Sequence, residues 1–249
     1  MLAEERHARI VDMVRLRGTV TVPELAAALE TSESTIRRDL DKLDQAHQLV
    51  KVHGGATTRE SAHLTRDLTL GERHGLHDEE KRAICAHAAA LVQPDDFVYL
   101  DAGSTTEILL DLLPPTRAGY VTDSVSHAIR LAARGLSVTV LGGELKSATE
   151  ALVGPGALDA LSKLHFTLGF WGSNGITPEA GLTTPEPNEA MVKRVSLERT
   201  TRRYVLADAS KLGRTSLVTF ADFCDATIVT CGDVPEEYRS FDNVMEVSL

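Results

Sequence analysis

From residue 78 onward, short apolar runs alternate with longer amphipathic ones, and this alternation constrains the fold more than any other feature of the sequence. Several apolar runs have the length and composition of buried strands, and helical spacing lies between many of them. The predicted strands are 97–100, 119–122, 137–141, 167–170, 203–207, 226–230 and 243–247. The predicted helices are 79–92, 105–113, 124–134, 157–164 and 188–199. Such alternation implies a largely parallel sheet, so we expect an α/β fold.

The first 57 residues follow a different pattern. Residues 2–17 and 33–46 have helical spacing, and Thr21 with Glu24 forms a capping box that begins a short helix between them. Ser32 is expected to cap the third helix, whose apolar stripe leaves polar and basic side chains outside. Residues 49–56 alternate and then turn at two glycines, which predicts a β-wing. This order predicts a winged helix-turn-helix whose third helix enters the major groove of DNA.

The predicted DNA contacts lie on the third helix and in the wing. Arginine suits guanine because its fork meets two acceptors at once, whereas lysine more often meets phosphate. The candidates are Ser32, Ser34, Thr35, Arg37, Arg38, Lys42, Lys51, His53 and Gly54. The alternative is a three-helix bundle whose outward arginines are only solvated. The order of caps, helices and a glycine-tipped hairpin favours DNA binding.

The net charge of −10 argues against a nucleic-acid binder until it is divided along the chain. Residues 1–57 contain 8 Lys and Arg and 9 Asp and Glu. Subtracting these from totals of 26 and 36 leaves 18 basic and 27 acidic residues in the remainder. The acidity therefore belongs to the larger part of the chain. We expect a DNA-binding domain at 1–57, a linker at 58–77 and a sensing domain at 78–249.

Polar and glycine-rich clusters follow five of the predicted strands, where ligands bind in parallel α/β sheets. The cluster at residues 101–106 opens a helix, so its free backbone N–H groups and hydroxyls would form a cup for an anion. One such cluster would more often be a turn with a helix cap, but five at corresponding ends favour a shared site. The ligand-binding candidates are Asp101, Gly103, Ser104, Thr105, Thr106, Asp123, Ser124, Gly142, Asn174, Asp208 and Lys211. Glu189, which lies in the predicted helix 188–199 and not at a strand end, is a further candidate.

Several classes of site and location are not expected. The sequence has no GxxxxGK[ST], no GxGxxG opening a helix after a strand, and no GxSxG. Cys85, Cys224 and Cys231 lack CxxC spacing, so neither a disulfide framework nor a metal site is expected, and no cofactor is expected either. No apolar run approaches the roughly 18–20 residues of a membrane span. Acids stand where a secretion signal would be basic, which predicts a cytoplasmic protein.

Several stretches resemble the DeoR family of bacterial transcriptional regulators. Its winged helix-turn-helix is resembled by Ser34-Thr35-Ile36-Arg37-Arg38-Asp39-Leu40-x-x-Leu43 and Val52-His53-Gly54-Gly55-Ala56. Its C-terminal sensor domain is resembled by Leu100-Asp101-x-Gly103-Ser104-Thr105-Thr106, Leu141-Gly142-Gly143, Gly181-Leu182-Thr183-Thr184 with Glu189 and Val192-Lys193-Arg194, and Leu206-Ala207-Asp208-x-Ser210-Lys211. The resemblance implies a sensor similar in fold to ribose-5-phosphate isomerase. It also implies a repressor of a carbohydrate operon that a phosphorylated sugar releases from DNA.

The resemblance also assigns roles within the sensor. It places the phosphate on Gly103, Ser104 and Thr105, with Asp208 and Lys211 near the sugar. Asp123 and Asn174 differ from the family's usual Asn and Asp, which leaves the identity of the ligand open. Likewise, His47 and Lys51 replace the usual Gly and Arg near the wing.

The expected partners are a double-stranded DNA operator, a phosphorylated sugar effector and further copies of the chain. A dimer or tetramer is expected because one winged helix contacts few bases. The rival hypothesis is a sugar-phosphate isomerase with a DNA-binding appendage, for which Asp101, Glu189, Asp208 and Lys211 are the candidate catalytic groups. Asn174 stands where a carboxylate base would be expected and cannot act as one, so the sequence favours a regulator over an enzyme.

Overall fold

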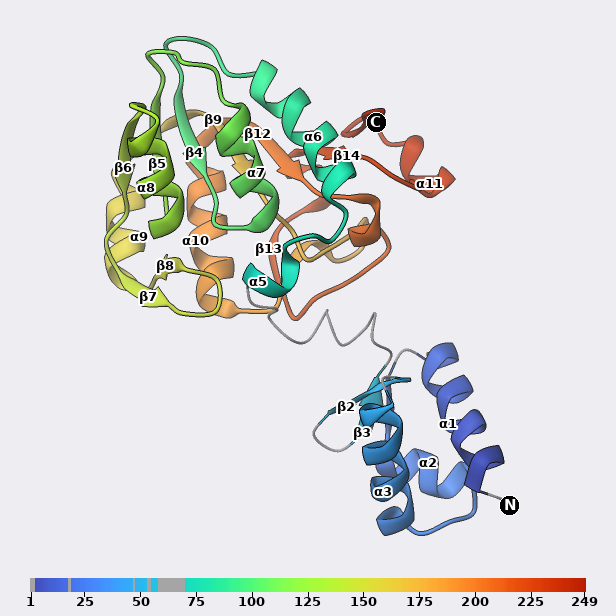
Figure 1. Cartoon of the computed structure of the whole chain (residues 1–249). Coiled ribbons are helices and arrows are strands. Elements are labelled where there is room, and N and C mark those ends of the chain that lie inside the picture. Colours follow the sequence, from blue (N-terminus) through green and yellow to red (C-terminus); the bar gives the residue numbers. More distant parts are fainter. Residues whose placement is uncertain (1–2, 18, 47, 53–54, 58–69) are drawn as a thin grey trace. The chain divides into compact units, whose positions relative to one another are not determined.

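The computed structural model describes residues 3–17, 19–46, 48–52, 55–57 and 70–249 (Figure 1). The chain divides into two compact units, Met1–Arg66 and Asp67–Leu249. We call them the DNA-binding unit and the sensor unit and describe each by itself. The predicted wing residues His53 and Gly54, and residues 58–69 of the predicted linker, lie outside the described residues.

The DNA-binding unit has the predicted order of helices and hairpin. It contains α1 (Ala3–Arg17), β1 (Thr19–Thr21), α2 (Val22–Ala28), α3 (Glu33–Gln45), β2 (Val50–Val52) and β3 (Gly55–Thr57). The strands form an antiparallel sheet in the order β1-β3-β2. Its apolar core contains fully buried side chains from α1, α2 and α3, among them Ile10, Leu25, Ile36 and Leu40. The winged helix-turn-helix arrangement is therefore confirmed.

Side-chain caps explain where two of these helices begin. The capping box at Thr21 is present: its backbone N–H donates to Glu24 Oε2 at 2.7 Å, and Glu24 N–H donates to Thr21 Oγ1 at 3.4 Å. Ser32 caps α3 by accepting a hydrogen bond from Thr35 N–H at 3.2 Å. These bonds satisfy backbone donors that would otherwise have no partner in the first turn of a helix.

One ion-pair network in this unit was not apparent from the sequence. Asp39 is buried on the inner side of α3, where Arg6 Nε donates to it at 2.6 Å and His7 Nε2 lies at 2.9 Å. Burial raises the pKa of Asp39, but the hydrogen bonds from Arg6 and His7 outweigh that effect and hold it below its ordinary value. Because both partners lie on α1, the network fastens α1 to α3.

The sensor unit is built on a seven-stranded parallel sheet. In spatial order its strands are β15 (Val244–Glu246), β14 (Thr227–Thr230), β12 (Thr200–Leu206), β9 (Phe166–Trp171), β4 (Phe97–Leu100), β5 (Gly119–Thr122) and β6 (Ser137–Val140). All seven predicted strands pair in this sheet, so the predicted α/β class is confirmed.

Helices cover both faces of the sheet (Figure 1). Along β4, Val98 and Leu100 enter one core while Tyr99 enters the other, as the alternation of side chains in a strand requires. The core containing Leu100 packs against α6 (Asp78–Ala90), α7 (Ser104–Leu112) and α8 (Val125–Ala133). The core containing Tyr99 packs against α9 (Pro155–Ser162) and α10 (Pro187–Glu198).

Short elements that the sequence did not predict complete the unit. They are α5 (Leu70–Arg73), the hairpin of β7 (Glu144–Lys146) and β8 (Ala151–Val153), the antiparallel sheet of β10 (Gly175–Thr177), β11 (Gly181–Thr184) and β13 (Val218–Ala221), and α11 (Glu236–Arg239). Each is too short to show a period in the sequence. The helix α6 begins one residue earlier than predicted and without a side-chain cap, because His77 occupies the cap position at φ 55° and makes no side-chain cap bond. Within the described residues, no helix is long and apolar enough to cross a membrane.

Candidate functional site

The candidate DNA contacts lie at the start and on the outer face of α3. Ser32 and Ser34 are exposed and hydrogen-bonded to each other at 2.9 Å, and Thr35 is half-buried beside them. Arg37, Arg38 and Lys42 are exposed further along the helix. An exposed polar face at the beginning of this helix is the geometry that a helix-turn-helix presents to the major groove.

Two of the basic candidates are held by carboxylates in the absence of DNA. Arg37 donates to Glu33 one turn earlier at 2.9 Å. Lys51 of β2 binds Asp41 of α3. In the described part of the chain, Arg38 and Lys42 make no ion pair. Arg38 can therefore bind a base without first breaking an ion pair within the protein, whereas Arg37 cannot.

The order of strands brings the sensor candidates together. Because β12, β9, β4 and β5 are neighbours and parallel, their carboxyl ends meet at one edge of the sheet. Asp208, Gly172, Asp101 and Asp123 all follow the ends of these strands. The sequence predicted this convergence from the strand-end clusters alone.

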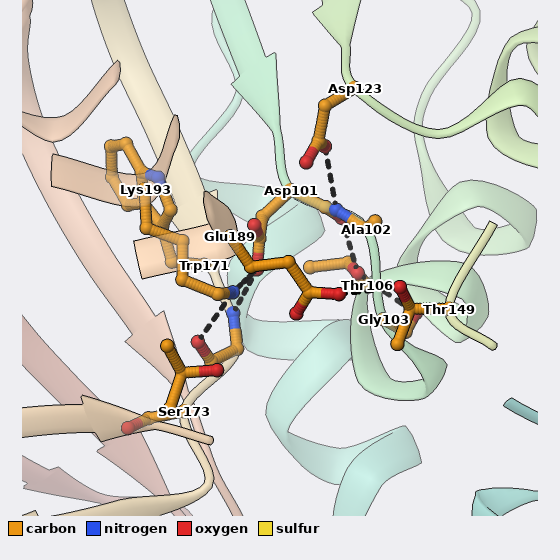
Figure 2. A network of polar contacts seen from close by, with 12 residues as sticks. Asp101, Ala102, Gly103, Thr106, Asp123, Thr149, Trp171, Ser173, Glu189 and Lys193 are labelled. Carbon is orange, nitrogen blue, oxygen red and sulfur yellow. Dashed lines mark hydrogen bonds and ion pairs between the residues drawn. The ribbon is translucent and has the colours of Figure 1, made fainter. Parts of the chain in front are cut away.

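Asp101 is the centre of a buried polar network that joins these ends (Figure 2). It is 1% exposed and accepts hydrogen bonds from Gly172 N–H at 2.9 Å and from Lys193 Nζ. Lys193, which reaches in from α10, also donates to Gly172 O at 3.1 Å. Asp123 Oδ1 accepts from Ala102 N–H at 2.8 Å, next to Asp101 along the chain. The Asp101 carboxylate thus joins the ends of β4 and β9 to α10, and Asp123 joins the end of β5 to the backbone beside it.

The two aspartates of this network have different environments. Burial raises the pKa of Asp101, and the charge and hydrogen bond of Lys193 oppose the rise. Burial, followed by the charge of Asp101, raises the pKa of Asp123 well above its ordinary value. Two close carboxyl groups resist being ionised together. Asp123 therefore holds a proton more readily than Asp101, which keeps its charge beside Lys193.

Glu189 begins a second branch of the network, in the first turn of α10. It accepts a hydrogen bond from Thr149 Oγ1 at 2.5 Å (Figure 2) and another from Lys146 Nζ at 2.9 Å. Both residues belong to the β7–β8 hairpin. Burial raises the pKa of Glu189, but these two bonds outweigh it and bring the pKa below its ordinary value. Glu189 is consequently an ionised group that ties the hairpin to α10.

The loop at residues 101–106 leads into α7 and meets a lysine that the sequence analysis missed. Gly103 precedes the helix, and Ser104 is its first residue. Lys81 of α6 is 4% exposed, and its Nζ lies 3.4 Å from Ser104 Oγ and 3.1 Å from Arg73 O. Its signal in the sequence was its place four residues before the buried Cys85, on one face of a predicted helix.

Further cations act on Lys81. Lys211 Nζ lies 3.2 Å from Ser210 Oγ and 3.9 Å from the buried Asp208. Burial lowers the pKa of both Lys81 and Lys211, and charges of neighbouring cations lower them further, while the charge of Asp208 opposes this. The cations that act on one another in this way are Lys81, Lys211, Arg73 and Arg214, which we call the cationic group.

Other candidates lie in local structure. Thr106 Oγ1 donates to Asp101 O at 2.7 Å and to Gly103 O at 2.9 Å, so this hydroxyl braces the loop, and Thr105 is half-buried beside it. Ser124 caps α8 by accepting from His127 N–H at 3.3 Å.

Two candidates lie at the margins of the network. Asn174 Oδ1 accepts from Thr184 Oγ1 at 3.3 Å, and Gly142 is exposed just before the β7–β8 hairpin. In residues 70–249 and the described parts of the DNA-binding unit, no group of three or more His, Cys, Asp and Glu could hold a metal ion.

Sequence reasoning also missed Lys193, Lys146 and Thr149. Lys193 lies one turn after Glu189 on the predicted helix, and that spacing could have placed it on the same inward face. Lys146 and Thr149 belong to the β7–β8 hairpin, and nothing in the sequence indicated that this hairpin folds back onto Glu189.

Comparison with known proteins identifies both units. The DeoR-like helix-turn-helix domain matches residues 6–62, and the DeoR C-terminal sensor domain matches residues 76–232. The chain belongs to the DeoR family of transcriptional regulators. This is a family of regulators and not of enzymes, so the expectation that the chain is not an enzyme is confirmed.

Relatives match the regulator along nearly its whole length. The uncharacterized HTH-type transcriptional regulator FruR of Bacillus subtilis is 39% identical and covers 100% of this chain and 98% of its own. GlpR of Haloferax volcanii is 38% identical, over 96% of this chain and 94% of its own. The lactose phosphotransferase system repressor of Streptococcus mutans is 31% identical over 94% of each chain. Among solved structures, ribose 5-phosphate isomerase A from Neisseria gonorrhoeae matches 55% of the regulator and 54% of its own chain, at 16% identity and a TM-score of 0.42.

Proposed function

We propose that this regulator represses a carbohydrate-metabolism operon and that a phosphorylated sugar, bound at residues 101–106 of the sensor unit, releases it from DNA. It acts in the cytoplasm as a homodimer or a homotetramer, because a single winged helix contacts too few bases for specific affinity. The observation that carries the effector assignment is the position of the buried Lys81 of α6. Its Nζ lies 3.4 Å from the Oγ of Ser104, the first residue of α7.

A phosphate group matches this arrangement in geometry and charge. The first backbone N–H groups of α7 have no partner within the helix, and the helix dipole favours an anion there. The cationic group adds charges whose mutual repulsion and burial lower the pKa of Lys81 and Lys211. A bound dianion would offset both costs, which supports a phosphate monoester as the ligand.

The names of relatives support the carbohydrate assignment. The relative from Streptococcus mutans is a lactose phosphotransferase system repressor, as are relatives from Staphylococcus epidermidis and Staphylococcus aureus that are 30% identical to the regulator. Similarity over 94% or more of this chain makes a related role the best proposal for the regulator.

The short helix α5 is the described segment of the sensor unit that comes first in the sequence after the DNA-binding unit, and it contacts the proposed effector site. Arg73 O of α5 accepts a hydrogen bond from Lys81, the same lysine that lies beside Ser104. The next residue, His74, lies 2.7 Å from Glu107 in the first turn of α7. A phosphate at Ser104 would draw Lys81 away from Arg73 O. We propose that this displaces α5, the first described helix of the sensor unit, and so changes the arrangement of the two units.

Fluorescence anisotropy on the DNA upstream of the regulator's own gene tests this proposal. Sugar phosphates are added in turn at moderate salt. Tight, salt-sensitive binding that one sugar phosphate reverses is the expected result. Binding that no sugar phosphate changes would contradict the effector assignment, and absence of specific DNA binding would contradict the repressor assignment.

A further inference from the structure

The two ends of the loop at residues 101–106 differ in electrostatic character. From this we infer that the effector carries a single phosphate group and an uncharged polyhydroxyl end, and that sugar bisphosphates are poor effectors. The inference rests on the proposed effector site and specifies the class of ligand that the site accepts.

The end of the loop at Ser104 is cationic. The buried Lys81 places its Nζ 3.4 Å from Ser104 Oγ, and the charges of Lys211 and Arg73 act on one another and on it. The carboxylates of Asp208 and Asp78 oppose the effect of burial on Lys81, and Asp208 also accepts hydrogen bonds from the backbone and hydroxyl of Ser210. A buried lysine beside the first turn of α7 is suited to one phosphate dianion.

The end of the loop at Asp101 is acidic. Asp101, Asp123 and Glu189 are all buried, and we call them the acidic group. The lysines that face them are already bound: Lys193 to Asp101, and Lys146 to Glu189. No cation in the described part of this end is left to neutralise a second phosphate. Burying an unpaired charge costs several kcal/mol, so a second phosphate is disfavoured here.

Hydroxyl groups, by contrast, fit the acidic group. Carboxylate oxygens accept hydrogen bonds from hydroxyls, and a protonated Asp123 can donate one. The Tyr99 hydroxyl is fully buried beside Asp123 and Asp101 and adds a further polar atom to this end. A sugar hydroxyl both donates and accepts, which suits this end, whereas a phosphate dianion only accepts.

The two ends are close enough for one small molecule to reach both. Asp101 and Ser104 are three residues apart in the same loop, a span of at most about 10 Å. A sugar phosphate can therefore place its phosphate at Ser104 and its hydroxyls at the acidic group. The acidic group thus acts as a filter on the far end of the ligand.

Paired ligands test the inference with the full-length regulator. Binding is followed by the fluorescence of Trp171, the single tryptophan, which is buried in the sensor core, and by thermal stabilisation at matched ionic strength. The probes are fructose 1-phosphate and fructose 6-phosphate against fructose 1,6-bisphosphate, ribulose 5-phosphate against ribulose 1,5-bisphosphate, and inorganic phosphate. The monophosphates that bind are expected to bind roughly tenfold or more tightly than the matching bisphosphate. A bisphosphate that binds as tightly as its monophosphate, or more tightly, would overturn the inference.

A variant tests whether the acidic group is responsible. Glu189→Gln removes one negative charge of the acidic group, the carboxylate that Lys146 Nζ binds at 2.9 Å, and should narrow the preference for monophosphate over bisphosphate. Glu198→Gln, an exposed site on the same helix, is the matched control and should leave the preference unchanged. An unchanged preference in Glu189→Gln would count against the filter. If no phosphate compound binds, inorganic phosphate included, the proposed effector site itself fails, which is a different result from a preference for bisphosphates.

Discussion

In the DNA-binding unit the candidate contacts are mostly exposed side chains on the outer face of α3. In the sensor unit most candidate contacts are buried and are hydrogen-bonded within the protein. The first arrangement keeps function apart from stability, because α3 packs through its apolar stripe and its outer face is free to meet DNA. In the second, the carboxylate of Asp101, itself a candidate contact, joins two strand ends to α10, and Asp123 binds the backbone N–H next to it. Substitutions should therefore separate binding from stability in the first unit and couple them in the second.

The largest effect is expected from Lys193→Met, which leaves Asp101 buried without its cation. Removing one partner of a buried pair costs about 3–5 kcal/mol of unfolding free energy, measured here by urea denaturation with Trp171 fluorescence. Lys163→Met is the matched control, since Lys163 and Asp159 are 67% and 69% exposed and such pairs contribute at most about 1 kcal/mol. Equal effects of the two variants would contradict the central role of the Asp101 network.

Arg38→Ala should affect function alone. Loss of one base-reading arginine should weaken specific DNA binding by about 1–3 kcal/mol, without change in the unfolding free energy or in ligand binding. Arg117→Ala, at an exposed site of the sensor unit, should leave anisotropy on operator DNA unchanged. Retained operator affinity in Arg38→Ala would refute the recognition-helix assignment.

Asp123→Asn tests, through the pH dependence of stability, whether a buried aspartate of the sensor unit is held protonated. The folded pKa of Asp123 lies well above the unfolded value of about 3.9, so its contribution to stability is full below that value and is lost as pH rises towards the folded pKa. Asparagine keeps the acceptor for Ala102 N–H but cannot ionise. The variant should therefore gain stability over the wild type as pH rises from 5 to 8, in urea titrations followed by Trp171. A difference that does not change with pH would show that Asp123 is not held protonated.

The pH dependence of stability should have the opposite direction for Asp39 in the DNA-binding unit. The folded pKa of Asp39 lies below its ordinary value, so its contribution is present above the unfolded pKa and is lost as pH falls through the folded pKa. Circular dichroism should show that acidification below about pH 4 removes an advantage of the wild type over Asp39→Asn. Asp12→Asn, at an exposed position of α1, should show no such dependence. An Asp39→Asn difference that persists at lower pH would contradict the assigned shift.

The smallest effect is expected from the cap of α3. Ser32→Ala removes the acceptor for Thr35 N–H and should cost about 1 kcal/mol of unfolding free energy in the DNA-binding unit. Ser34→Ala keeps the bond to Thr35 N–H and removes only the exposed 2.9 Å contact between Ser34 Oγ and Ser32 Oγ, so it should cost less. Thermal unfolding followed by circular dichroism distinguishes them, and equal destabilisation by both would argue against the cap.

The sequence predicted the parts of this molecule that repeat with a period or carry a local signal. The seven strands of the large sheet, the capping box at Thr21 and the exposed face of α3 were all accessible in this way. Strand-end clusters also placed Asp101, Asp123 and Asp208 at one edge, because parallel strands end together.

What the sequence did not predict depends on contacts between distant segments. Lys81, Lys146 and Lys193 reach their partners from three different elements, and no local pattern distinguishes a lysine that turns inward from one that is solvated. The β7–β8 hairpin is too short to show a period, so its contact with Glu189 could not be foreseen. The network of cations was therefore the main omission, and it is what gives the two ends of the loop their different character.

The measurement that tests the central claim most directly is operator anisotropy of Ser104→Asp beside the wild type, titrated with the sugar phosphate that releases the wild type. We expect the variant to bind operator normally but not to be released, because an aspartate at the start of α7 places a negative charge where the phosphate would bind. Ser162→Asp, at an exposed position of α9, should respond as the wild type does. Normal release of Ser104→Asp by the same sugar phosphate would contradict the claim that phosphate binding at residues 101–106 controls DNA binding.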